Sequence, residues 1–200
     1  MNIITFLSYC VIVTFTPGPT NIVIASIAQN SGINKASKFV LGSTLGFGML
    51  LSISALFNKV LVNILPRVLP IMQVIGCIYI LYLAVQILKK GTTSKKHVSG
   101  SVPNSYFLEG LLMQFVNPKV VMFTMTVIPS YILPYYSSAK ILMIYVCVIA
   151  FIGFLAFSMW VMMGVFSKAF LQKQQKAVNI IMALFLFYSA FMVSGLEALL

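Results

Sequence analysis

The chain has 200 residues, of which 60% are hydrophobic and only 8% are charged, and its mean hydropathy is +1.04. This composition excludes an ordinary soluble domain and indicates a protein that crosses a membrane several times. The net charge of +11 comes from basic residues that gather in short loops. Their expected role is to orient the chain in the membrane, and we expect no nucleic-acid partner.

Apolar stretches of roughly 18 residues or more, the length of a spanning helix, predict an all-α membrane protein with six transmembrane helices. The predicted helices lie at about 3–27, 39–58, 68–88, 107–131, 140–166 and 177–199. Residues 89–106 are rich in Gly, Ser and Lys, so we expect them to form a solvated cytoplasmic linker. Residues 1–4 lack the basic region of a secretion signal, so we expect the first helix to be retained.

The two halves of the chain show a weak internal repeat. Residues 6–28 align with 107–129, and residues 75–87 align with 181–193. This predicts one three-helix repeat over 1–88 and a second over 107–200. Because three is odd, the second copy would enter the membrane from the opposite side, and inverted repeats of this kind are typical of secondary transporters.

Polar breaks interrupt the first and fourth predicted helices at matched places. The breaks are Thr16-Pro17-Gly18-Pro19-Thr20-Asn21 and Asn117-Pro118-Lys119. Thr or Asn followed by Pro is a helix-start signature, so Thr16 and Asn117 are predicted caps of helices that begin at Pro17 and Pro118. Both breaks fall near the middle of a span, where the first amide groups of each half-helix would attract an anionic group. The alternative is that both prolines only kink packed helices.

Lys119 is the one charged residue near the middle of any predicted span. An ammonium group there costs at least about 2.5 kcal/mol on insertion scales, so we expect it to face a wet cavity. It could bind a substrate carboxylate or exchange a proton. The alternative is a lysine whose long stem reaches the membrane surface.

Tyrosines and glycines provide further candidates. Tyr79, Tyr82 and Tyr188 lie at matched positions of the two repeats and either line a cavity or fill it. The second predicted helix carries glycines that favour close helix packing, namely Gly42, Gly46 and Gly48.

The distribution of Lys and Arg predicts the orientation of the chain. Nine basic residues fall in the first, third and fifth connections, and three fall in the second and fourth. Since cytoplasmic loops carry the excess of positive charge, the odd connections are predicted to be cytoplasmic and both chain ends to lie outside.

The chain has only two acidic residues, and both lie at predicted helix ends. A dibasic solute or a metal ion would need a buried acid, so a neutral zwitterion fits better as the substrate. Catalytic triads, metal-ligand spacings and phosphate-binding loops are not found, so we expect neither an enzyme nor a cofactor. Two alternatives remain open: an exporter of metal or other cations, and a thiol-disulfide relay through Cys10, Cys77 or Cys147.

Several of these motifs together resemble the LysE/RhtB family of amino-acid exporters. They are Thr16-Pro17-Gly18-Pro19, the glycine-rich helix around Gly42 to Gly48, Ile75-Gly76-Cys77, Phe107-Leu108-Glu109-Gly110 and Asn117-Pro118-Lys119. The resemblance implies a six-helix protein of the bacterial inner membrane that exports amino acids by proton antiport, with an oligomeric state open between monomer and homodimer.

Within that family, the chain is most similar to the branch that exports cysteine and O-acetylserine. The residues that carry this likeness are Leu45-Gly46-Phe47, Gln114-Phe115-Val116-Asn117, Ile132-Leu133-Pro134 and Val178-Asn179-Ile180. Many family members have an acidic residue where this chain has Phe47, and the departure leaves threonine/homoserine and leucine types open as well. We therefore expect a small neutral amino acid or derivative as the substrate.

Overall fold

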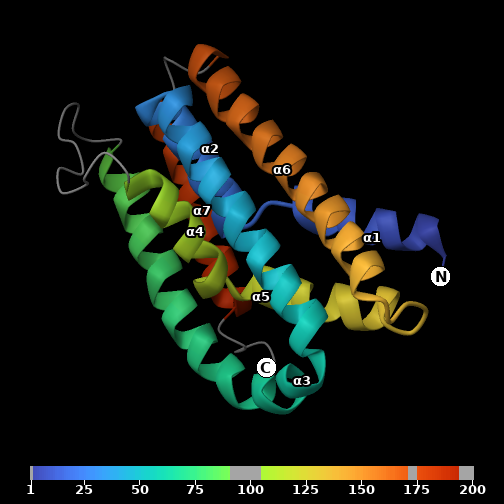
Figure 1. Cartoon of the computed structure of the whole chain (residues 1–200). Helices are drawn as coiled ribbons and strands as arrows, with labels where there is room; N and C mark the ends of the chain where they lie inside the picture. The colour runs from blue at the N-terminus through green and yellow to red at the C-terminus, as the bar shows by residue number, and fades with distance from the viewer. Residues whose placement is uncertain (1, 91–104, 171–174, 194–200) are drawn as a thin grey trace.

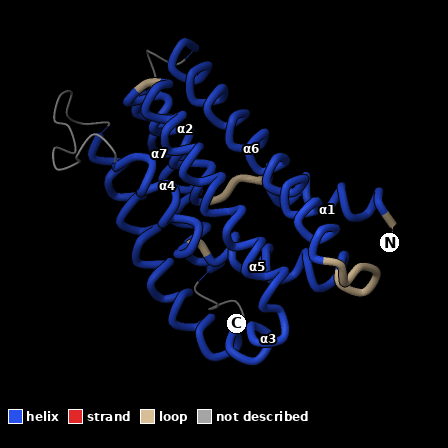
Figure 2. The backbone as a smooth tube through the Cα atoms, in the orientation of Figure 1, coloured by secondary structure: helices blue, strands red, loops and turns tan. Residues whose placement is uncertain are grey.

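The computed structural model describes the backbone of residues 2–90, 105–170 and 175–193, and every regular element in these ranges is helical (Figures 1 and 2). The elements are α1 (Ile3–Phe15), α2 (Pro19–Ser31), α3 (Ile33–Lys90), α4 (Ser105–Val116), α5 (Pro118–Val127), the π-helical turn η1 (Ile128–Ile132), α6 (Ala139–Phe170) and α7 (Gln175–Val193). For this part of the chain, the prediction of an all-α protein is confirmed.

Two stretches of helix are long and apolar enough to cross a membrane unbroken, Ile33–Phe57 in α3 and Ala139–Phe166 in α6. Two bent helix pairs are long and apolar enough only when each pair is taken together: α1 and α2 meet at 50°, and α4 meets α5 with η1 at 64°. The remaining apolar helices, Gln73–Leu88 and Asn179–Phe191, are shorter than a full span. The six-span prediction is therefore confirmed only in part, and the inverted repeat stays a prediction.

The connection expected between the second and third predicted helices, residues 59–67, is itself helical and belongs to α3. Within α3 only Phe57 leaves the helical region, with φ −113° and ψ 21°. The chain turns back there, so α3 has a first limb (33–57) and a second limb (58–90), as Figure 1 shows. Polar residues such as Asn58 and Lys59 mark where a chain leaves lipid, but they do not by themselves break helical hydrogen bonds. The predicted linker lies largely outside the described residues.

The first limb of α3 and α4 pack with their backbones in close approach. A Cβ atom added at Gly42 would overlap the carbonyl oxygen of Phe107, and one at Gly46 would lie 2.6 Å from the carbonyl oxygen of Leu111. Gly48 differs, because a Cβ atom there would meet only Ala150, at an ordinary 3.9 Å. Two of the three predicted packing glycines thus lie where only glycine fits without a shift.

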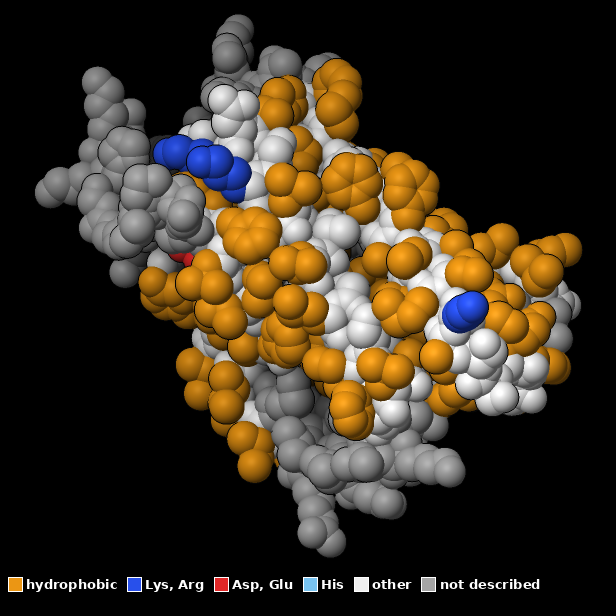
Figure 3. All heavy atoms as spheres, in the orientation of Figure 1, with side chains coloured by type: hydrophobic (Ala, Val, Ile, Leu, Met, Phe, Trp, Pro, Cys, Tyr) orange, Lys and Arg blue, Asp and Glu red, His pale blue; other side chains and the backbone are white. Residues whose placement is uncertain are grey.

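Hydrophobic side chains cover most of the described surface between the two ends of the bundle (Figure 3). Among them, Ile4 is 78% exposed, Ile12 65% and Phe166 63%. An exposed apolar surface of this extent is stable where lipid replaces water as the surrounding medium. The bundle is thus built to hold polar groups inside and apolar groups outside.

Gly42→Ala tests the backbone contact between α3 and α4. We expect the variant to lose about 1–3 kcal/mol of stability, because the added methyl group forces the two helices apart. Thermal unfolding of the purified protein in detergent measures the loss, with Gly48→Ala as the matched control that should unfold like the wild type. Equal unfolding temperatures for both variants would contradict the close approach at Gly42.

Candidate translocation site

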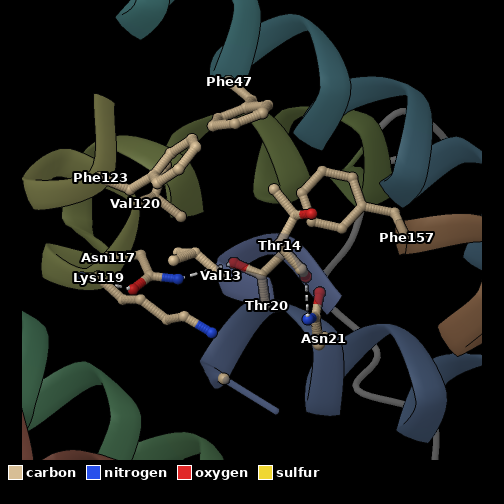
Figure 4. Close-up of a pocket in the computed structure, with 11 residues that line it drawn as sticks. Val13, Thr14, Thr20, Asn21, Phe47, Asn117, Lys119, Val120, Phe123 and Phe157 are labelled. Atoms are coloured by element: carbon tan, nitrogen blue, oxygen red, sulfur yellow. Dashed lines mark hydrogen bonds between the residues drawn. The ribbon is translucent and has the colours of Figure 1, made fainter. Parts of the chain in front are cut away.

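The two helix breaks meet in the interior of the protein. Asn117 lies before α5 with extended φ and ψ of −81° and 103°, and its side-chain oxygen accepts the Lys119 amide at 3.1 Å. Its Nδ2 donates to the Thr20 hydroxyl oxygen, in the first turn of α2, at 2.9 Å. The prediction that Asn117 caps a helix beginning at Pro118 is confirmed, and the same side chain connects that helix start to the other break (Figure 4).

At the first break, the prediction of a helix that begins at Pro17 under a Thr16 cap is wrong. The second helix begins at Pro19, and the residue before it, Gly18, is extended with φ −161° and ψ 172°. The physical reason is Pro19 itself, since a residue that precedes proline is disfavoured in the helical region. Thr16 instead ends α1, and its hydroxyl donates back to the Ile12 carbonyl.

Side chains from other parts of the protein satisfy the last carbonyl groups of α1. Asn21 Nδ2 donates to the carbonyl oxygens of Thr14 and Thr16, at 2.9 Å each, and the Trp160 indole donates to that of Phe15 at 3.2 Å. The end of a helix leaves such carbonyls without intrahelical partners, and in a membrane interior water does not replace them. These contacts hold the break open at its 50° angle.

The Lys119 ammonium reaches from α5 to the end of α1. Its Nζ donates to the carbonyl oxygen of Thr16 at 3.0 Å and to that of Pro17 at 3.4 Å. The direction fits the helix dipoles, because a cation is disfavoured at the start of α5 and favoured at the end of α1. Gly18 makes room for the stem, since a Cβ atom there would lie 3.1 Å from both Cδ and Nζ of Lys119.

The two helix starts differ in their caps. The start of α5 is capped by Asn117, whereas Gly18 at the start of α2 supplies no side-chain cap. The first-turn amides of Thr20 and Asn21 therefore have no intrahelical partner. Of the two helix starts, that of α2 is the better binding site for an anionic group, because no side chain caps its amides.

Two cavities adjoin these groups, and Lys119 and Gly18 line both. The smaller one, between α1, α2, α3 and α5, has a volume of about 30 Å³, which is room for one water molecule (Figure 4). The larger one has a volume of about 440 Å³ and is lined on its other side by the second limb of α3 and by α7. Its further lining residues are Thr16, Pro17, Pro19, Gln73, Pro118, Met122, Phe185, Tyr188 and Ser189. The larger volume suits a small organic molecule.

The predicted tyrosines do not share one cavity. Tyr188 lines the 440 Å³ cavity, whereas Tyr79 and Tyr82 line a separate cavity farther along α2. Sequence reasoning did not name Gln114 as a site residue. Gln114 is fully buried, and its Nε2 donates to the Gly110 carbonyl at 3.1 Å and to the Thr20 hydroxyl at 3.4 Å. A glutamine in an apolar stretch was the available signal.

Interrupted helices that meet inside a membrane-spanning bundle, around a cavity with a half-buried cation, are typical of a membrane transport protein. The family model of the LysE type translocators matches residues 11–194. The chain belongs to this family, as its sequence motifs predicted.

Three relatives share the likeness over nearly the whole chain. A protein of Escherichia coli (strain K12), described as a cysteine/O-acetylserine efflux protein, is 27% identical over 185 residues, which cover 92% of this chain and 93% of the relative. Proteins of the same description from Escherichia coli O157:H7 and Shigella flexneri serotype 5b (strain 8401) match with the same identity and coverage. No solved structure matches the chain.

Thr20→Val tests the contact that joins the two breaks. The substitution removes the acceptor of the Asn117 amide in a buried place, so we expect a loss of about 1–3 kcal/mol. Thr126→Val is the matched control, because that hydroxyl is exposed and bonds only within its own helix, to Met122. Thermal unfolding in detergent separates the two variants, and an unchanged transition in Thr20→Val would show that the breaks are held by other contacts.

Proposed function

We propose that the protein is a secondary active exporter of small neutral amino acids in the cytoplasmic membrane of a bacterium, driven by proton antiport. The observation that carries the proposal is the open start of α2, beside a Lys119 ammonium that occupies the carbonyl groups at the end of α1. These groups face a 440 Å³ cavity, which is large enough for an amino acid.

The substrate carboxylate binds at the start of α2 in this proposal. Gly18 and Pro19 line the cavity, and no side chain caps the amides that follow them. Oriented amides at a helix start and the positive end of the helix dipole favour a carboxylate. The start of α5 is less available, because Asn117 already accepts its Lys119 amide.

The substrate ammonium competes with Lys119 for the same oxygen atoms. A protonated Lys119 donates to the carbonyl groups of Thr16 and Pro17. A substrate ammonium at the end of α1 would use these acceptors, so the two cations exclude each other. Mutual exclusion of proton and substrate is what antiport requires, and Lys119 is therefore proposed as the proton carrier.

The remaining walls of the cavity suit a small uncharged side chain. Met122, Phe185 and Tyr188 are mostly apolar, and no carboxylate is among the described residues that line the cavity. A dibasic amino acid would leave its second cation unpaired there. The relatives described as cysteine/O-acetylserine efflux proteins make these two molecules the first substrates to test.

The other two functions find less support in the described residues. No group of three His, Cys, Asp or Glu side chains that could hold a metal ion occurs among them. For a thiol relay, Cys10 is buried, Cys77 is partly buried and Cys147 is exposed, and Cys10 and Cys77 pack in different hydrophobic clusters. Neither arrangement brings reactive groups together as the two alternatives would need.

Everted membrane vesicles test the proposed function. With an acidic interior, we expect labelled cysteine or O-acetylserine to accumulate inside, and accumulation should stop when the pH gradient is collapsed. Absence of gradient-dependent uptake for these and for threonine, homoserine and leucine would overturn the proposal.

Lys119→Met tests the role of the ammonium group. We expect it to abolish gradient-driven accumulation and to preserve exchange of labelled for unlabelled substrate without a gradient, because the carbonyl acceptors become free. Lys140→Met, at an exposed lysine of α6, is the matched control and should behave like the wild type. Loss of both activities, with normal membrane insertion, would assign Lys119 to carboxylate binding instead, and retention of both would exclude either role.

We further propose that both chain ends lie outside the cytoplasm. Lys35 and Lys38, at the turn from α2 into α3, belong to the basic connections that the positive-inside rule assigns to the cytoplasm. The start of α4 lies at the same end of the bundle as this turn (Figure 1).

Reporter fusions test this orientation. Alkaline phosphatase fused after residue 200 should be active, and fused within the 89–106 linker it should be inactive, because the enzyme folds only outside the cytoplasm. Green fluorescent protein at the same two points should give the opposite pattern. A fluorescent fusion at residue 200 would reverse the proposed orientation.

A further inference from the structure

A cavity separate from the two that adjoin Lys119 lies between α2, the second limb of α3 and α4, and the translocation site does not use it. It is called the second cavity below. Its volume is about 260 Å³. Its polar and aromatic lining residues are Ser26, Tyr79, Tyr82, Gln86, Tyr106 and Glu109. The mixture of hydroxyl, amide, aromatic and carboxylate groups is typical of a binding site for a small polar molecule.

The charges around this cavity match those of a zwitterion. Glu109 carries the one carboxylate of the described residues, in a chain with only two acidic residues. The Lys35 ammonium lies 5.5 Å from the centre of the Tyr106 ring, so a cation already rests on one wall. Among the described residues, Glu109 forms no ion pair with Lys35. An amino acid could therefore place its ammonium at Glu109 and its carboxylate toward Lys35.

This cavity and the 440 Å³ cavity follow each other along the second limb of α3. Gln73 lines the larger cavity and Tyr79 lines the smaller one, and the six-residue step between them along the helix corresponds to ~9 Å. Between these two residues, Gly76 packs closely against the break between α4 and α5. A Cβ atom added at Gly76 would lie 2.7 Å from the Val116 carbonyl oxygen and 3.0 Å from Pro118 Cδ.

Apolar packing closes the same interval. Ile22 of α2, Ile80 of α3 and Leu186 of α7 belong to one buried cluster, with exposures of 3%, 1% and 0%. A solute in the second cavity is therefore separated from the central one by a dry barrier in this conformation. A cavity outside a closed barrier is where an alternating-access transporter first meets its substrate.

We propose that the second cavity is the loading vestibule of the exporter, where the ammonium group of a cytoplasmic amino acid binds Glu109 before the barrier opens. This inference rests on the proposed function and orientation, since Lys35 and Lys38 assign this end to the cytoplasm. Figure 3 shows basic side chains at this end of the molecule and a small acidic patch lower on the same side. Tyr79 and Tyr82 form its aromatic wall.

Glu109→Gln tests the vestibule through a difference between the two membrane faces. In everted vesicles, where substrate loads from the cytoplasmic face, we expect KM for substrate exchange to rise about ten-fold, as for a lost charged contact worth ~1.4 kcal/mol. In right-side-out vesicles KM should stay unchanged. Glu109→Asp should keep most of the affinity, and Lys38→Gln, at an exposed neighbouring charge outside the cavity lining, should keep all of it.

An analogue without the ammonium group gives the second measurement. The 2-hydroxy acid that corresponds to the substrate should lose no affinity in Glu109→Gln, because its hydroxyl group carries no positive charge for the Glu109 carboxylate to pair with. An unchanged KM at the cytoplasmic face, or an equal rise at both faces, would overturn the vestibule and leave the proposed function intact. A wild-type protein that exchanges no amino acid at all would instead overturn the proposed function, and this inference with it.

Discussion

The hydrogen bond from Asn117 to Thr20 joins two interrupted helices in the interior of the protein. In hydrocarbon each unsatisfied backbone or amide group costs several kcal/mol, so a helix break persists only when the protein supplies partners. Asn117, Asn21, Trp160 and Lys119 supply them here, from the start of α5, from α2 and from α6. The bends of 50° and 64° follow from this set of contacts.

Small residues give these polar groups their positions. Gly18 leaves space for the Lys119 stem, and Gly76 lets the second limb of α3 lie against Pro118. Gly42 does the same for the first limb of α3 against α4. Without these approaches the side chains at the two breaks would be too far apart to bond, so glycine packing on the helices and hydrogen bonding between the breaks depend on each other.

Sequence reasoning found what depends on local patterns. The cap at Asn117, the start at Pro118 and the interior position of Lys119 follow from residue type and from distance to the ends of an apolar stretch. The helix after the first break was predicted to start two residues too early. The Thr-Pro signature favoured Pro17, and the effect of Pro19 on Gly18 was not weighed against it. The reversal at Phe57 lies at the predicted end of the second helix, whereas the separation of Tyr188 from Tyr79 depends on packing between distant helices.

The contrast between a capped α5 and an uncapped α2 has a consequence for how one chain uses two similar segments. Two segments of similar sequence both interrupt a helix, yet one has its first amide satisfied by its own asparagine and the other leaves its amides to whatever enters the cavity. In the proposed transport cycle, one break therefore acts as a fixed support and the other as the binding site. A likeness between two segments of one chain shows where helices stop, and the chemistry of each stop is decided by its neighbours.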